Sequence, residues 1–205
     1  AVNHSYYANE LQGERYWDYV SQELPRMMHS MFRLSQAPGT ELVAGLSMGG
    51  YGAMKLALTY PERFAAAASF SGAVDLSLML RDPNVPGLRE VFAPIFGDSL
   101  ALPKASNLHY VAQKAAELPP QRQPKILLTN GLQDFEPYHI VEQNDSLHAT
   151  LHKLNLAYYR RIQWDGVHEW NFWDRSLVYA IDYFLGNGYA AKKMNDWRSS
   201  AVIHQ

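Results

Sequence analysis

The stretch "ELVAGLSMGGYGAMKLAL", residues 41–58, contains the strongest local signal of the chain. It begins with a short apolar run, which is typical of a buried strand, and ends with apolar residues at helical spacing. Between these parts lies Ser47, flanked by Gly45 and Gly49. Glycines at these positions remove side chains where a sharp strand-to-helix turn would clash. The pattern alone is equally compatible with a nucleophilic serine on a strained turn and with a serine that merely lies in a flexible loop or caps a helix. The rest of the chain has to decide between them.

Apolar runs and helical patterns alternate along the chain. Strands are predicted at residues 41–46, 63–76, 125–129 and 156–164, of which the first two are apolar runs. Helical spacing predicts helices at residues 14–32, 51–60, 140–154 and 170–184. Such alternation predicts an α/β fold, a mostly parallel sheet with helices on both faces. With 205 residues the chain is long enough for a single domain and too short to argue for two.

The first and the last predicted helix each have a stripe of apolar residues, whereas residues 77–102 show no periodic pattern. The first helix is interrupted by Pro25, which predicts a kink or a restart; its apolar residues at helical spacing are Tyr16, Val20, Leu24, Met27 and Met31. The last helix places on one side Trp170, Trp173, Leu177, Ile181 and Phe184. Residues 77–102 contain prolines and glycines without a period, and we expect a cap-like insertion there.

Composition excludes several classes of function. Hydrophobic residues make up 47% and charged residues 19% of the chain, which is typical of a globular protein. With 18 basic and 20 acidic residues and no basic cluster, we expect neither nucleic acid nor a membrane as partner. The absence of cysteine excludes disulfides and a cysteine nucleophile, and is compatible with the cytoplasm, where we expect the protein. We also expect a homo-oligomer.

Three residues suited to nucleophilic catalysis each follow a predicted strand: Ser47, Asp134 and His168. Active sites of parallel sheets lie at the carboxyl ends of the strands, so these side chains are expected to meet. A serine hydroxyl needs a base such as histidine, and an acid behind the histidine holds the imidazole in place. The order serine, acid, histidine is that of α/β-hydrolases. Glu136 and Asp75 also follow strands and compete with Asp134 for the role of the acid.

Other residues with possible roles are judged differently. His148 and His152 are four residues apart beside Asp145 and could hold a metal ion, but they flank the predicted apolar stripe, so we expect exposed surface histidines and no metal. The backbone N–H of Met48, at the start of a helix, could point at a developing oxyanion. The cluster around Trp170 is expected to serve packing, although Trp170 could reach the mouth of the site and contact substrate.

Several blocks together resemble the esterase D-like branch of the α/β-hydrolases: "ELVAGLSMGGYGAMKLAL", "FAAAASFSGAVDL", "NGLQDF" and "GVHEWNFW". This branch includes tributyrin esterase, S-formylglutathione hydrolase and feruloyl or acetyl esterases, and the chain is most similar in type to tributyrin esterase. The resemblance implies hydrolysis of short-chain acyl esters without a cofactor. It also implies Ser47 as nucleophile, Asp134 as acid, His168 as base and Met48 as an oxyanion donor.

The chain departs from this family at its start. Family members have further strands before the first predicted helix, one of which ends in a His-Gly type turn that supplies a second oxyanion donor. No such segment precedes Glu14, so we expect a sheet with an exposed apolar edge and a separate N-terminal segment of the same protein as partner. Alternatives are a feruloyl or acetyl esterase acting on plant-wall polysaccharide, an S-formylglutathione-type thioesterase, an acyltransferase, or a non-catalytic remnant of a hydrolase.

Overall fold

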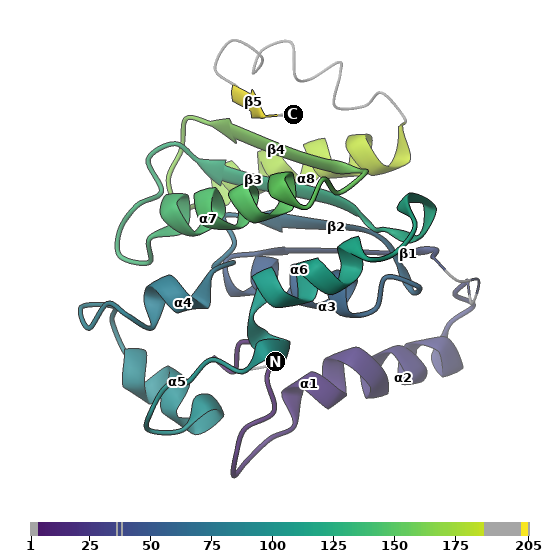
Figure 1. Cartoon of the computed structure of the whole chain (residues 1–205). Coiled ribbons are helices and arrows are strands. Elements are labelled where there is room, and N and C mark those ends of the chain that lie inside the picture. The colour runs from purple at the N-terminus through teal and green to yellow at the C-terminus, as the bar shows by residue number, and fades with distance from the viewer. Residues whose placement is uncertain (1–3, 36, 38, 187–201, 205) are drawn as a thin grey trace.

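A computed structural model of the chain describes residues 4–35, 37, 39–186 and 202–204. Its centre is a sheet with the strand order β1-β2-β3-β4-β5, visible in Figure 1. The strands are β1 Glu41–Leu46, β2 Phe64–Phe70, β3 Lys125–Gly131, β4 Tyr159–Trp164 and β5 Val202–His204. Strands β1 to β4 are parallel and β5 runs antiparallel to β4. The predicted mostly parallel sheet is therefore confirmed. Strand β5 is not predicted by the apolar pattern.

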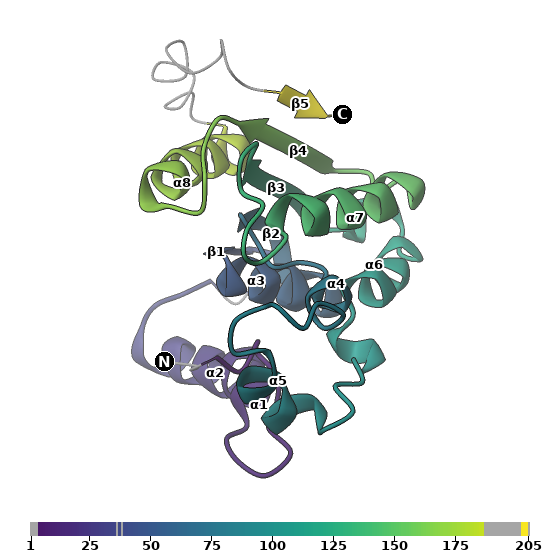
Figure 2. The same cartoon turned by 90° about the vertical axis from the view of Figure 1, so that its left-hand side faces the viewer.

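Helices cover both faces of the sheet, as Figure 2 shows with α8 on one side of the strands and α6 and α7 on the other. The α-helices are α1 Tyr16–Asp18, α2 Leu24–Met31, α3 Met48–Thr59, α4 Leu76–Met79, α5 Leu88–Phe96, α6 Leu108–Ala116, α7 Ile140–Lys153 and α8 Trp170–Leu185. A π-helical stretch, Tyr19–Glu23, joins α1 to α2, and 3-10 turns lie at Lys104–Ser106 and Pro120–Arg122. No helix in the described ranges is both long and apolar enough to cross a membrane.

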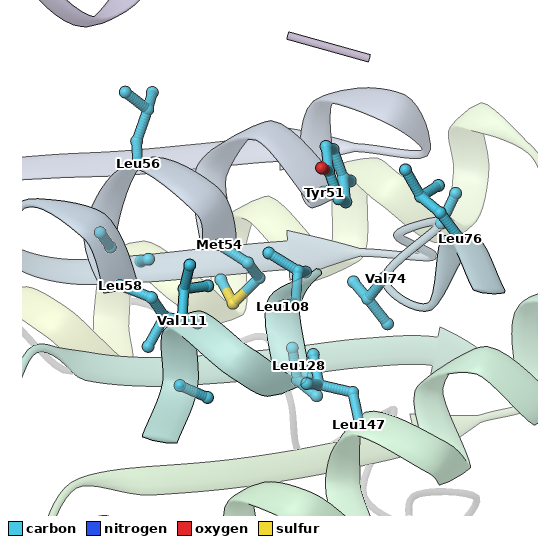
Figure 3. Packing of buried hydrophobic residues seen from close by; sticks show 14 of the residues in the cluster. Tyr51, Met54, Leu56, Leu58, Val74, Leu76, Leu108, Val111, Leu128 and Leu147 are labelled. Atoms are coloured by element: carbon cyan, nitrogen blue, oxygen red, sulfur yellow. The ribbon is translucent and has the colours of Figure 1, made fainter. Parts of the chain in front are cut away.

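The hydrophobic core consists of two clusters, one on each face of the sheet. Because successive strand residues point to opposite faces, Leu128 packs toward α3, α6 and α7, whereas Leu127 packs toward α8. Figure 3 shows the first cluster, in which Met54 of α3, Leu108 of α6 and Leu147 of α7 converge on the sheet. Helix α3, which begins directly after Ser47, packs against β1, β2 and α6.

The helix predicted at residues 14–32 differs from an ordinary amphipathic helix. The backbone stays helical from Tyr16 to Met31, so the helix does not restart at Pro25; the π-helical turn directly before Leu24 accommodates the proline within one continuous helix. However, no residue of α2 is buried, and Met27 and Met31 are 43% and 64% exposed. Among the described residues β1 pairs only with β2, so α2 lies beside an open sheet edge that offers it few neighbours.

The segment at residues 77–102 is more regular than its prolines indicate. It contains α5, which begins after Gly87 in a left-handed conformation (φ 65°) and tolerates Pro94 in its last turn. Phe92 and Ile95 of α5 are buried in the core. Helix α6 has no predicted counterpart either. Asn107 caps its N-terminus, and the Asn107 side chain accepts a hydrogen bond from the backbone N–H of His109 at 2.9 Å.

Candidate active site

Ser47 lies on a sharp turn between β1 and α3. Its backbone has φ 53° and ψ −124°, a conformation that costs a non-glycine residue on the order of 1–3 kcal/mol. A hydrogen bond from its N–H to the carbonyl of Phe70 (2.9 Å) holds the turn against β2. A side chain at Gly45 would come within 2.2 Å of the carbonyl oxygen of Gly49. Gly45 is therefore a packing requirement of this turn, whereas a side chain at Gly49 would meet only the Tyr7 hydroxyl at 3.6 Å, so the expectation of a clash at Gly49 is wrong. The alternative of a flexible loop is excluded.

The turn brings Ser47 to a histidine and an acid from two other strand ends. The Ser47 hydroxyl is 2.9 Å from Nε2 of His168, which follows β4. The Nδ1 atom of His168 is 3.1 and 3.2 Å from the two carboxylate oxygens of Asp134, which follows β3. Asp134 is only 2% exposed. With Nδ1 protonated, the ring donates to Asp134 and accepts from Ser47, which is the arrangement required for proton transfer during attack.

The two competing acids lie elsewhere. Glu136 is exposed at the surface. Asp75 is buried, and its carboxylate binds His109 (3.0 Å) and the hydroxyl of Ser146 (2.7 Å). Burial alone would raise the pKa of Asp75, but the hydrogen bonds from His109 and Ser146 outweigh it and hold the pKa well below its usual range. The structure therefore joins Asp75 to a different histidine and leaves Asp134 beside His168.

Aromatic rings surround the catalytic histidine candidate. Trp173 packs edge-on against His168 with ring centroids 5.0 Å apart, and the Tyr138 ring lies at 6.3 Å. Trp170 packs edge-on against Trp173 and is 67% exposed. Its side chain thus lies one ring away from His168 on the outside of the protein, and a role of Trp170 in substrate binding stays a prediction.

A cavity of about 480 Å³ opens beside the nucleophile candidate. Ser47 and Met48 form one side of it, and Met48 is the first residue of α3, where helix N–H groups lack partners within the helix. Most of the remaining wall is apolar or aromatic: Tyr6, Ala73, Met79, Val85, Leu88, Val91, Phe92, Tyr138 and Ile140. The segment at residues 77–102 supplies much of this wall, and its role as a cap stays a prediction.

An ion pair joins this segment to the loop before α7. Nε2 of His139 is 2.7 Å from a carboxylate oxygen of Asp82, and both side chains are about one quarter exposed. The hydrogen bond to Asp82 raises the pKa of His139, with smaller contributions from the charges of Glu142 and Glu136. Because His139 lies between the wall residues Tyr138 and Ile140, the pair connects two sides of the cavity.

The pair predicts a pH-dependent stability. A raised folded pKa means that the stabilisation is fully present below the ordinary histidine pKa and is lost as pH rises through the raised value. We expect the melting temperature of wild type to exceed that of Asp82→Asn at about pH 5.5 and the difference to vanish by about pH 8.5. Asp98→Asn, an exposed aspartate of the same segment, is the control. A difference independent of pH would contradict this role of the pair.

Of the two histidines predicted to be exposed, His148 and His152, only one lies at the surface. His152 is exposed, but His148 is half-buried and its Nδ1 is 2.6 Å from the hydroxyl of Tyr159, so the expectation of an exposed His148 is wrong. The reason is that the bulky Tyr159 on β4 closes over this side of α7. Asp145 instead pairs with the buried Arg161 at 2.7 Å. Within the described ranges no three potential ligands come together to hold a metal ion.

A parallel sheet with serine, acid and histidine at the carboxyl ends of its strands, and the serine on a strand-to-helix turn, defines the α/β-hydrolase fold. Comparisons with known proteins agree. A family model described as a putative esterase matches residues 2–184, and the chain belongs to this esterase family. It is therefore a hydrolase, and the resemblance to esterases inferred from the sequence is confirmed.

The chain is similar to several named esterases and serine hydrolases. The acetyl esterase of Caldicellulosiruptor saccharolyticus is 25% identical over 186 residues, which are 87% of this chain and 67% of the relative. The fluorophosphonate-binding serine hydrolase F of Staphylococcus aureus superposes with a TM-score of 0.74 at 30% identity, covering 88% of this chain and 67% of that one. An S-formylglutathione hydrolase of the same organism gives 0.70 at 30% identity, covering 88% and 68%. The chain thus spans about two thirds of each of these proteins.

Proposed function

We propose that the protein is a serine carboxylesterase that works through an acyl-enzyme. Its likeness to tributyrin esterase supports short-chain acyl esters as the substrates. The observation that carries this proposal is the chain of contacts from the Ser47 hydroxyl to Nε2 of His168 (2.9 Å) and from Nδ1 to Asp134 (3.1 Å). A weak nucleophile, a base and an orienting acid are the three groups that acyl transfer to serine requires.

The proposed reaction has two halves. Ser47 attacks the ester carbonyl while His168 takes the hydroxyl proton, and His168 then gives that proton to the departing alcohol. Water attacks the resulting acyl-enzyme, again giving a proton to His168, which returns it to Ser47 as the carboxylic acid leaves. Asp134 keeps the ring oriented and stabilises the imidazolium in both halves. The N–H of Met48 stabilises the oxyanion formed at each attack.

We further propose that a second oxyanion donor comes from a separate segment of the same protein that pairs with β1. The outer edge of β1 has no partner strand among the described residues. An adjacent groove of about 430 Å³ between β1 and α2 is lined by apolar residues such as Leu24, Met28 and Leu42. Loss of one oxyanion donor lowers the rate by about 10²–10³. A kcat of the chain alone in the usual range of about 1–10³ per second would contradict this proposal.

A covalent label tests the proposed nucleophile. A fluorophosphonate should attach to Ser47 of the folded protein and to no other serine, as located by mass spectrometry of the digested chain. Heat-denatured protein is the control, because the label requires the assembled site. Failure of the folded protein to react would favour the alternative of a non-catalytic remnant of a hydrolase.

The cavity predicts a preference within short acyl chains. Going from acetyl to butyryl adds two methylene groups, each worth about 0.8 kcal/mol when buried, so kcat/KM for p-nitrophenyl butyrate should exceed that for the acetate roughly tenfold. Val91→Phe replaces a residue of the cavity wall by a larger one and should lower the ratio of kcat/KM for the butyrate to kcat/KM for the acetate. Equal rates for both esters in wild type would show that the acyl chain does not enter the cavity.

A second candidate is an esterase for aromatic acyl groups such as feruloyl. The rings of Tyr6 and Phe92 lie in the cavity wall with centroids 4.8 Å apart and offer a surface for a planar acyl group. Hydrolysis of methyl ferulate faster than of p-nitrophenyl butyrate would favour this candidate. An S-formylglutathione-type thioesterase, the function named for one of the structural neighbours, would instead prefer the glutathione thioester.

Two further properties are proposed from the sequence. We propose a homo-oligomer, to which exposed apolar residues such as Met31 and Leu177 could contribute contacts (64% and 44% exposed). We also propose a cytoplasmic location. Sedimentation of the purified protein tests the first, and fractionation of cells tests the second.

A further inference from the structure

The acid and the base of the candidate triad stand on two separate loops. Asp134 lies on the loop between β3 and α7, and His168 on the loop between β4 and α8. Their side chains meet at 3.1 and 3.2 Å, which is long for a hydrogen bond to a carboxylate. A small displacement of one loop against the other would therefore break the contact. Whatever joins the two loops controls the orientation of His168.

One side chain spans the gap between these loops. The Oε1 atom of Gln133 accepts the backbone N–H of Gly166 at 2.8 Å, and its Nε2 donates to Asp165 at 3.2 Å. The backbone N–H of Gln133 also donates to the carbonyl of Gly166 at 3.2 Å. Gln133 directly precedes the acid, and the two residues that it binds lie just before the base. Gln133 is exposed, so these bonds do not serve core packing.

The backbones of the two loops also touch. A side chain at Gly131 would come within 2.0 Å of the carbonyl oxygen of Gly166. Gly166 itself has φ 157°, and a side chain there would come within 2.7 Å of the Phe172 ring. Close contact of this kind lets the short amide of Gln133 reach the second loop. It also means that the loops can move relative to one another only by opening this contact.

We propose that Gln133 is a positioning residue that holds the Asp134 loop and the His168 loop in register. The proposal rests on the proposed function. Gln133 itself does not touch the reacting atoms; it acts through the distance between Asp134 and His168. Its loss should therefore lower the rate of the chemical step and leave substrate binding in the cavity unaffected.

The first test removes the side chain. In Gln133→Ala, kcat for p-nitrophenyl butyrate should fall about ten- to hundredfold, the cost of a small misplacement of catalytic groups, while KM changes less than twofold. The low-field proton NMR resonance of His168 Nδ1–H should move upfield as the contact with Asp134 loosens. Gln121→Ala, an exposed glutamine on a distant turn, is the matched control. Unchanged kcat and an unchanged resonance in Gln133→Ala would overturn the proposal.

The second test restores the bonds with different groups. Gln133→Glu places two carboxylates together and should impair kcat. In Gln133→Glu/Asp165→Asn the donor moves to position 165 and the acceptor to position 133, so the bond forms in the reverse direction and most of kcat should be recovered. Asp165→Asn alone keeps an acceptor for Gln133 and should behave as wild type. A double variant as impaired as Gln133→Glu would overturn the proposal. If wild type shows no Ser47-dependent hydrolysis, the proposed function fails, and the NMR resonance still decides whether Gln133 positions the pair.

Discussion

Ser47→Ala is expected to lower kcat/KM for p-nitrophenyl esters by about 10⁴- to 10⁶-fold while the protein stays folded. Alanine keeps the β-carbon at the strained turn, so the hydrogen bond to Phe70 and the packing of Gly45 against Gly49 remain. What disappears is the atom that forms the acyl-enzyme. Steady-state hydrolysis and the melting temperature are the two measurements needed.

The control for this experiment is Ser99→Ala, because Ser99 is exposed on a turn of the cap and far along the chain from the triad. It should hydrolyse both p-nitrophenyl esters at the wild-type rate. Activity above about one hundredth of wild type in Ser47→Ala would mean that another group performs the attack, and the proposed acyl-enzyme at Ser47 would then be wrong.

Asp134→Asn should lower kcat by about 10⁴-fold with little change in KM. An amide at this position can accept only through one oxygen and offers an N–H toward Nδ1, so His168 is no longer held with its Nδ1 protonated. The ring then presents the wrong nitrogen to Ser47. Because Asp134 is 2% exposed, the variant should also be compared with wild type in thermal unfolding.

The matched control is Glu136→Gln, the same change of acid to amide two residues along the loop. Glu136 is exposed, and its replacement should leave kcat within about twofold of wild type. The reverse outcome, a crippled Glu136→Gln and an active Asp134→Asn, would identify Glu136 as the acid in solution.

The sheet and the strand-to-helix turn at Ser47 could be predicted because their signals are local. The glycines lie two residues on either side of Ser47, and the apolar residues of β1, β2 and β3 are close together in the sequence. The sequence favours Asp134 as the acid over Glu136 and Asp75, but it contains no distance from any of them to His168. That choice depends on which loop reaches His168, and this distance is a property of the folded protein.

Burial could not be read from periodicity alone. Helix α8 has two apolar faces, and the one noted in the sequence includes Leu177 and Ile181, which are 44% and 42% exposed. Phe172 and Tyr179, which lie outside that stripe, pack on the sheet together with Trp173, which belongs to it. Spacing shows that residues share a face but does not show which face meets a neighbour. For the same reason the cavity wall, assembled from distant segments, has no signature in the sequence.

The contact between Gly131 and Gly166 has a consequence for engineering. Loops at strand ends are commonly regarded as modules that can be exchanged one at a time to alter specificity. In this protein, the backbone at Gly166 lies against Gly131 at the end of β3. A donor loop after β4 whose backbone follows a different path at this position would collide with Gly131. Swaps of the two loops as a pair, taken from one parent, should yield active chimeras far more often than single swaps.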